Sequence, residues 1–322
     1  MIDFILVGGG LALLFFGGDF LVRGAVSLAH RLGVSTLVIA ITVVAFGTSL
    51  PELIVSLNAA LQGAPSIAIG NVVGSNIANV LLVLGLPAII APLVSQRSIG
   101  RDTAIMIGAS LLFVALAFTG EFGWPHGLLF VVLLAAFLGY SLWIATRDKE
   151  AADTYQEELD GFESDAKSAL LLAGFIVGGL VALIVGSRML VIGAVNIATT
   201  LGVSEAVIGL TLVAFGTSLP ELVTSLVAII RRHGDVAIGN VLGSNLFNIL
   251  GVMGITALVV PIPVPDQILR FDVWVMLAAA IVLLPFVLHW MRLGRTIGLL
   301  FFAAYIAYIA AQFHGMSGVH LP

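Results

Sequence analysis

Charged residues along this chain are sparse and clustered, and long apolar stretches lie between the clusters. Each stretch is roughly 20 residues or longer, enough for a helix to cross a hydrocarbon core about 30 Å thick. Ten such stretches are predicted to be transmembrane helices, at 4–28, 34–61, 66–92, 103–121, 125–146, 168–198, 203–230, 236–260, 271–290 and 296–313. The pattern therefore predicts an all-α integral membrane protein.

Composition supports this prediction. Of the 322 residues, 60% are hydrophobic and only 10% are charged, and the mean hydropathy is +1.17. These values lie far outside the range of soluble domains. The first residues, MIDFILVGGG, lack the basic segment of a cleaved signal peptide, so the first span is expected to be retained. The chain has no cysteine, which excludes disulfides and thiolate metal sites.

Two sequence motifs occur twice. The segment AFGTSLPEL at 45–53 is identical to 214–222, and GNVVGSNIAN at 70–79 returns as GNVLGSNLFN at 239–248. Both repeats have the same offset, since 214 − 45 = 169 and 239 − 70 = 169. The chain is thus predicted to consist of two homologous halves of five spans each, 1–146 and 168–322. An odd number of spans places the second half upside down relative to the first, as in the inverted repeats of many transporters.

The halves are joined by an acidic linker at 147–167, which holds eight of the 18 acidic residues. A solvated connection is expected there, with weak cation sensing as the alternative. Basic residues favour the cytoplasmic side of membranes. If both termini lie outside, 11 of the 13 basic residues fall at or near cytoplasmic ends, and only Arg188 and Arg270 remain outside. We therefore expect both termini outside and the linker inside, in a plasma membrane of the bacterial inner-membrane type.

Glu52 and Glu221 lie about halfway along the second and seventh predicted spans. A carboxylate at the bilayer centre costs about 2.5–3.5 kcal/mol on insertion scales, so its presence needs compensation. Pro51 and Pro220 come directly before these glutamates and are predicted to break both helices. Backbone carbonyls freed by such a break are tolerated only in a protein-lined cavity, where they can bind cations. The alternative is a pair of structural carboxylates that neighbouring hydroxyls satisfy.

Polar residues also recur at helical spacing on the third and eighth spans. The two triplets have i, i+4, i+8 spacing and are Asn71, Ser75, Asn79 and Asn240, Ser244, Asn248. Each triplet forms a stripe on one helix face, which could join helices or contribute to a pocket. Together with the glutamates the stripes offer only oxygen ligands, and no histidine lies deep in a span. Oxygen ligands favour calcium or sodium over zinc, copper or iron.

One further pair of residues occupies equivalent positions in the two halves, since 188 − 19 = 169. Asp19 lies in the first span and Arg188 in the sixth, and their charges are opposite. We expect them to form an ion pair between these two glycine-rich spans, or alternatively a gate contact.

The motifs GTSLPE and GNxxGSNxxN strongly resemble the alpha-repeats of the cation/calcium antiporter (CaCA) superfamily, which includes the sodium/calcium exchangers. The resemblance covers both halves and implies a ten-helix fold, with termini outside and broken helices two and seven. It also implies a calcium and sodium pocket. By motif position, the implied ligands are Glu52, Ser75, Asn79, Glu221, Ser244 and Asn248. The implied sodium sites involve Thr48, Ser49, Thr217 and Ser218 and the backbone carbonyls of Ala45 and Ala214.

Two details refine the resemblance. Asn248 stands where potassium-dependent relatives carry aspartate, which argues against potassium cotransport. The second motif also differs from that of the proton-coupled branch, which has a glutamate after GN. We therefore expect sodium/calcium antiport by alternating access, with proton/calcium antiport as the alternative.

Two other functions remain open at this stage, a passive channel and an intramembrane hydrolase. The hydrolase is disfavoured because no histidine or lysine accompanies a serine at membrane depth. We expect a transporter and not an enzyme, with no cofactor apart from the transported ions. Its expected partners are membrane lipid and the calcium and sodium ions, with no nucleic acid and no obligate protein partner.

Overall fold

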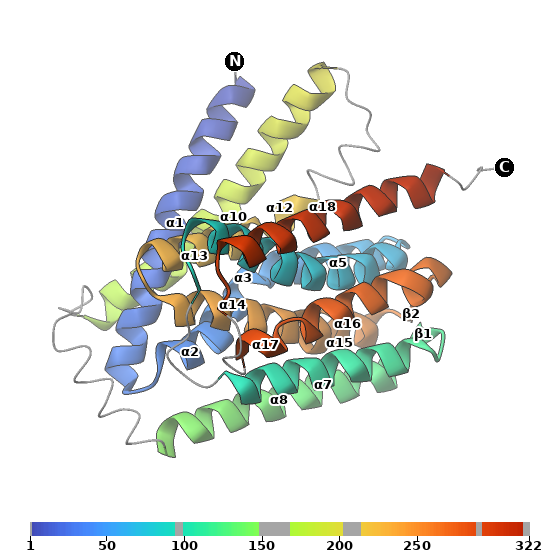
Figure 1. Cartoon of the computed structure of the whole chain (residues 1–322), viewed down its shortest axis with the longest axis horizontal. Helices are drawn as coiled ribbons and strands as arrows, with labels where there is room; N and C mark the ends of the chain where they lie inside the picture. Colours follow the sequence, from blue (N-terminus) through green and yellow to red (C-terminus); the bar gives the residue numbers. More distant parts are fainter. Residues whose placement is uncertain (1, 94–98, 148–167, 202–213, 288–291, 318–322) are drawn as a thin grey trace.

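The computed structural model describes residues 2–93, 99–147, 168–201, 214–287 and 292–317, and it is almost entirely helical (Figure 1). In the first half the elements are α1 (Ile2–Leu32), α2 (Thr36–Ile39), η1 (Ala40–Val44), α3 (Ala45–Thr48), α4 (Leu50–Leu61), α5 (Pro65–Ala78), η2 (Asn79–Leu84), α6 (Gly85–Ile90), α7 (Gly100–Ala117), β1 (Glu121–Phe122) and α8 (Trp124–Arg147). In the second half they are α10 (Ala169–Thr200), α12 (Ala214–Thr217), α13 (Leu219–Ile230), α14 (Gly234–Leu246), η4 (Phe247–Val252), α15 (Met253–Val259), β2 (Ile262–Pro263), η5 (Ile268–Asp272), α16 (Val273–Ile281), α17 (Leu284–Val287) and α18 (Arg295–Ser317). Elements named η are π-helical turns.

Eight described helices are long and apolar enough to cross a membrane, which confirms an all-helical membrane protein. They are Ile2–Leu32, Pro65–Ile90, Gly100–Ala117, Trp124–Ile144, Ala169–Thr200, Gly234–Val259, Ile268–Phe286 and Arg295–Gln312. A ninth candidate is the bent pair Thr36–Thr48 and Leu50–Leu61. Each of these nine overlaps one predicted span. The tenth predicted span, 203–230, is described only from 214 onward, and the acidic linker beyond 147 lies outside the described residues.

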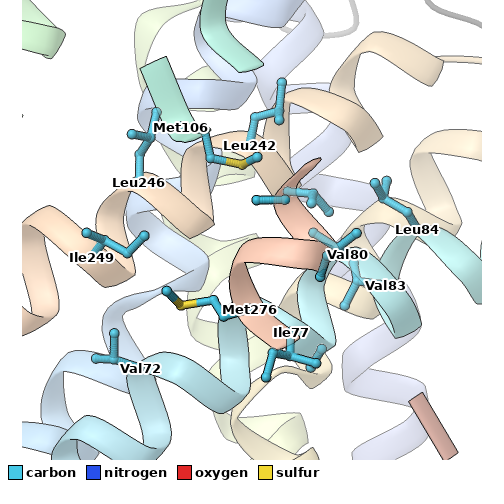
Figure 2. Close-up of a cluster of buried hydrophobic side chains, with 14 of the residues drawn as sticks. Val72, Ile77, Val80, Val83, Leu84, Met106, Leu242, Leu246, Ile249 and Met276 are labelled. Atoms are coloured by element: carbon cyan, nitrogen blue, oxygen red, sulfur yellow. The ribbon is translucent and has the colours of Figure 1, made fainter. Parts of the chain in front are cut away.

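The most buried spans form the centre of the molecule. They are α5–η2–α6 and α14–η4–α15, which occupy equivalent places in the two halves. Figure 2 shows buried apolar side chains of both spans, with Met276 of α16 lying in this view between Ile249 of η4 and Val80 of η2. The remaining long helices surround this centre and expose large apolar side chains, as expected beside lipid.

Helices α1 and α10 form a separate antiparallel pair that lies along one side of this centre (Figure 1). Their contact is lined by glycines, which allow the two backbones to approach closely. A Cβ added at Gly10 would lie 2.7 Å from the nitrogen of Leu190, and one added at Gly179 would lie 2.8 Å from the carbonyl oxygen of Gly17.

The predicted ion pair between Asp19 and Arg188 is wrong. Asp19 forms a salt bridge with Arg23 of its own helix, at 3.0 Å, and a second salt bridge with Arg231 at the end of α13. Arg188 is exposed. The cause is the antiparallel arrangement of α1 and α10. A Cβ at Gly17 meets Ala182 and one at Gly24 meets Ile176, so Asp19 lies level with residues 176 to 182. Arg188 is at least six residues further along α10 (188 − 182 = 6), about 9 Å away along the axis.

Short contacts between loops also tie the halves together. Strand β1 pairs antiparallel with β2, Glu121 opposite Pro263 and Phe122 opposite Ile262. Leu93 forms an isolated antiparallel bridge with Leu293. Each contact joins a loop of the first half to a loop of the second half.

Candidate cation-binding site

Helical geometry is interrupted just before each glutamate of the repeated motif. In the first half the interruption is at Ser49, which has φ −84° and ψ 2° between α3 and α4, and the two helices are bent by 40°. In the second half Ser218 has almost the same backbone, φ −86° and ψ 4°, between α12 and α13. Pro51 and Pro220 lie at the start of the following helices, where a missing N–H costs nothing.

The two glutamates lie in the first turn of these helices and are buried, Glu52 with 1% and Glu221 with 0% of its surface exposed. Ser49 of the first half donates to Oε1 of Glu221 in the second half at 3.5 Å. Residues of both halves therefore meet around one acidic centre.

The first asparagine of each polar stripe holds the interrupted helix in place. Asn71 donates through Nδ2 to the carbonyl oxygen of Glu52 at 3.3 Å and to Ser56 at 3.0 Å. Asn240 repeats both bonds, to the carbonyl oxygen of Glu221 at 3.3 Å and to Ser225 at 3.2 Å. The NH₂ group of each asparagine is therefore used in hydrogen bonds to the helix that carries the glutamate.

One hydroxyl joins the two halves directly. Thr48 donates to Oδ1 of Asn240 at 3.2 Å and lies 3.5 Å from the hydroxyl of Ser244. The carbonyl oxygen of Ala45, a predicted sodium ligand, accepts from the amide of Ser49 at 3.0 Å and lies 3.4 Å from the Thr48 hydroxyl. This carbonyl is therefore already engaged within the first half.

The other predicted ligands are also buried. Ser75 lies on α5, Asn79 is the first residue of η2, Ser244 lies on α14, and Asn248 lies in η4, each with at most 4% of its surface exposed. Of the remaining predicted residues, Thr217 is half-buried at the end of α12, and Ala214 begins that helix.

Five buried oxygens of this set have no hydrogen-bond partner among the described residues. They are Oε2 of Glu52, Oε2 of Glu221, Oδ1 of Asn79, Oδ1 of Asn248 and Oγ of Ser218. An unpaired buried polar atom costs about 1–3 kcal/mol, and such atoms are rare in folded proteins. These five oxygens are therefore available as ligands for a bound cation.

The ligand chemistry restricts the kind of cation. No cluster of three or more His, Cys, Asp and Glu side chains occurs in the described part of the chain. The site offers two carboxylates together with amide and hydroxyl oxygens, which suit hard cations such as calcium and sodium.

Two groups of site residues were missed by the sequence reasoning. Ser56 and Ser225 accept from the stripe asparagines, and the repeat could have revealed them because 225 − 56 = 169. Asn245, within the motif GSN, accepts from Asn79 at 3.0 Å. The repeat could not have revealed this contact, because the equivalent residue of the first half, Asn76, instead donates to the carbonyl oxygen of Val72 on its own helix.

The sequence is similar to those of known ion exchangers and membrane proteins. The sequence profile of the family described as "Sodium/calcium exchanger protein" matches residues 2–143 and 171–314. The sodium/calcium exchanger MaX1 of Methanosarcina acetivorans is 34% identical over 353 residues, covering 97% of this chain and 99% of the relative. Inner membrane protein YrbG of Escherichia coli is 34% identical over 309 residues, covering 94% of both chains.

A solved structure of the sodium-calcium exchanger NCX_Mj, soaked with zero Na⁺ and Ca²⁺, is similar throughout. It superposes with a TM-score of 0.84 at 33% identity, covering 97% of this chain and 99% of that one. The similar proteins with a stated activity are ion exchangers, that is, transporters and not enzymes. This chain belongs to the sodium/calcium exchanger family of the cation/calcium antiporter superfamily.

Proposed function

We propose that this chain exchanges sodium for calcium across the plasma membrane by alternating access. The observation that carries the proposal is the set of five unpartnered buried oxygens, which come from both halves of the chain. Two of them belong to Glu52 and Glu221, the buried carboxylates of the two repeated motifs. Two negative charges neutralise one calcium ion or two sodium ions, so occupancy by the two cations is mutually exclusive. Antiport follows from this exclusion.

The proposed ligands are those of the repeated motifs. Calcium would be held by Glu52, Glu221, Ser75, Ser244, Asn79 and Asn248. Sodium would use the same carboxylates with Thr48, Ser49, Thr217, Ser218 and the carbonyls of Ala45 and Ala214. The transported ions are the only ions that the proposal requires, with lipid as the surrounding partner.

The proposed topology has ten spans, and the strand contact supports it. Because β1 and β2 pair, both lie on one side of the membrane, and the chain between them crosses an even number of times. Three long apolar helices lie between them, Trp124–Ile144, Ala169–Thr200 and Gly234–Val259. An even number needs a fourth crossing, which the segment ending in α13 supplies as the seventh span.

A second contact supports the second span by the same reasoning. Asn196 near the end of α10 donates to Asp3 at the start of α1 at 2.8 Å, so these two helix ends share a side. From the start of α1 to the end of α10 the chain contains five long apolar helices, α1 and α10 included. Two chain positions on one side of the membrane must be separated by an even number of crossings. The bent pair Thr36–Thr48 and Leu50–Leu61 provides the sixth crossing. The halves 1–146 and 168–322 are then inverted repeats with broken second and seventh helices.

Alternating access is proposed to arise from movement of the α1–α10 pair against the central spans. The glycine contacts bind α1 and α10 closely to each other. Both helices expose much of their surface to lipid, which leaves them freer to move than α5 and α14. An ion can shift the protein between two conformations only if it binds one of them more tightly.

Flux measurements test the proposal. The purified protein is placed in liposomes, and calcium uptake is measured with a sodium gradient at uniform pH and, separately, with a pH gradient in sodium-free buffer. We expect uptake with the sodium gradient only. Uptake driven only by the pH gradient would establish the proton-coupled alternative, and calcium flux without any coupled ion would establish a channel.

Variants connect this flux to the site. Glu52→Gln and Glu221→Gln keep the side-chain size but remove the charge, and each is expected to reduce uptake about 100-fold or more. Glu121→Gln, at an exposed position in β1, is the control and should transport normally. Full sodium-dependent uptake by both site variants would refute the assignment.

A further inference from the structure

Three buried side chains from three different helices form a directed chain of hydrogen bonds that ends at the site. Nδ2 of Asn79 donates to Oδ1 of Asn245 at 3.0 Å. Nδ2 of Asn245 in turn lies 3.5 Å from the sulfur of Met106 on α7. All three residues have at most 2% of their surface exposed. Once Asn79 has donated to Asn245, its Oδ1 is the atom left without a partner.

The sulfur of Met106 fixes the direction of this chain. A thioether sulfur is a weak acceptor and has no hydrogen to donate. If the Asn245 amide were turned over, its oxygen would face the sulfur and its NH₂ would face Asn79. The Asn79 amide would then have to turn over as well, and its NH₂ would point away from Asn245. The sulfur therefore favours the arrangement in which Asn79 keeps an oxygen free.

Met106 is itself held firmly in the apolar core. Figure 2 shows it among the buried side chains, close to Leu242 and Leu246 of α14. Asn245 lies between these two leucines in the sequence, on the same helix. The position of the sulfur relative to the Asn245 amide is thus set by close packing.

No such chain occurs among the described residues of the second half. The equivalents of Asn79 and Asn245 are Asn248 and Asn76, since 79 + 169 = 248 and 245 − 169 = 76. Asn76 donates at 2.7 Å to the carbonyl oxygen of Val72 on its own helix. Asn248 makes no side-chain hydrogen bond within the described residues. Asn79 and Asn248 therefore differ in their hydrogen bonding although their motifs are repeated.

We propose that Asn245 is a positioning residue that orients the Asn79 amide so that Oδ1 of Asn79, and not its NH₂, faces the transported cation. This inference rests on the proposed cation site. Asn245 does not contact the cation itself. Asn245 affects binding only by orienting Asn79, and Met106 in turn orients Asn245. These contacts make the first half of the pocket the more rigid half.

Calcium binding to the purified full-length protein, measured by calorimetry in detergent, tests the proposal. Asn245→Leu is similar in size but cannot accept from Asn79, and the calcium Kd is expected to rise about tenfold. The matched control is Asn76→Leu, which also removes a buried amide but leaves Asn79 and Asn248 untouched, so the Kd should stay within about twofold. Thermal unfolding without calcium checks that each variant is folded.

A double-mutant cycle separates positioning from general damage. Asn79→Ala alone should weaken calcium binding, and adding Asn245→Leu to it should cause little further change. Additive effects of the two substitutions, or an unchanged Kd in Asn245→Leu, would overturn the positioning role while leaving the site assignment intact. An unchanged Kd in Asn79→Ala would overturn the assignment of Asn79 as a ligand and the inference with it.

Met106→Leu gives a second test if Asn245→Leu does not fold. Leucine and methionine exchange with little cost in protein cores, so this variant should be stable. Without the sulfur the Asn245 amide loses its preferred direction, and the calcium Kd should rise about threefold. Met276→Leu, in the same apolar cluster (Figure 2), is the control and should bind normally. Equal behaviour of the two variants would contradict the proposal.

Discussion

Asn71 donates a hydrogen bond to the backbone carbonyl oxygen of Glu52 at 3.3 Å, across from one helix to the next. The relationship recurs in the second half, where Asn240 donates to the carbonyl oxygen of Glu221 at the same distance. In each half the bond fixes the residue whose carboxylate we assign to the cation. Each polar stripe thus has two roles, since its first asparagine holds the backbone and its last leaves an oxygen free.

Substitution of either clamping asparagine should therefore loosen the site. Asn71→Leu removes two hydrogen bonds from a half-buried position, and Asn240→Leu removes three from a fully buried one. The expected loss of stability is about 1–3 kcal/mol in each case. Calcium uptake at saturating calcium should fall about tenfold, because the carboxylate is no longer held in one position. Asn58→Leu, at an exposed position on α4, is the control. Normal uptake by both Asn71→Leu and Asn240→Leu would show that the backbone at the glutamates does not depend on these hydrogen bonds.

The ten-span topology can be tested by cysteine labelling, because the chain has no cysteine of its own. Single cysteines at four exposed positions, Leu32, Thr119, Arg232 and Asp266, report on four loops. An impermeant maleimide applied to right-side-out vesicles should label Thr119→Cys and Asp266→Cys and should not reach the other two. The opposite result for all four would reverse the orientation but keep ten spans. Labelling of Arg232→Cys together with Asp266→Cys would show that the eighth span does not cross.

The candidate site could be proposed from the sequence because its residues belong to a repeated motif. Glu52 and Glu221 are expensive at membrane depth, and the prolines beside them break helices wherever they occur, so both features can be recognised without a fold. In the structure, helical geometry is interrupted locally at Ser49 and Ser218. These are local effects of residue type and position.

The failures concern contacts between helices. The pair of Asp19 with Arg188 was predicted from equal positions in the repeat, but equivalent residues of antiparallel helices coincide only where the helices cross. Asp19 instead reaches Arg231, which comes from a different span. The contact of Asn79 with Asn245 likewise depends on which helix faces which, and a repeat cannot reveal a bond that only one half makes.

His233, in the loop between α13 and α14, should make stability depend on pH. Its pKa is lowered from the usual 6.5, first by burial and then by Arg231, and Asp235 opposes the shift only in part. The folded protein therefore takes up a proton less readily than the unfolded chain. As pH falls below about 6.5 toward the lowered value, unfolding becomes coupled to proton uptake, and stability is lost. At higher pH this contribution is constant.

The measurement is thermal unfolding in detergent between pH 8 and pH 5. His233→Gln should reduce the drop in melting temperature on the acid side and leave the melting temperature at pH 8 nearly unchanged. His30→Gln, at an exposed position at the end of α1, is the control and should retain the wild-type profile. Identical profiles for His233→Gln and the wild-type protein would contradict the linkage.

The contact between α1 and α10 gives the sharpest comparison, because two adjacent glycines of α10 have opposite surroundings. A Cβ at Gly179 would lie 2.7 Å from the nitrogen of Leu21, whereas one at Gly178 would have no neighbour within 4 Å. Gly179→Ala should force the helices apart at a cost of about 1–3 kcal/mol. Gly178→Ala should instead stabilise the protein by about 0.5–1 kcal/mol, since alanine favours helix over glycine. Melting temperatures in detergent should therefore move in opposite directions, and calcium uptake should fall only in Gly179→Ala. Equal effects of the two substitutions would mean that close approach of these backbones is not what holds α1 and α10 together.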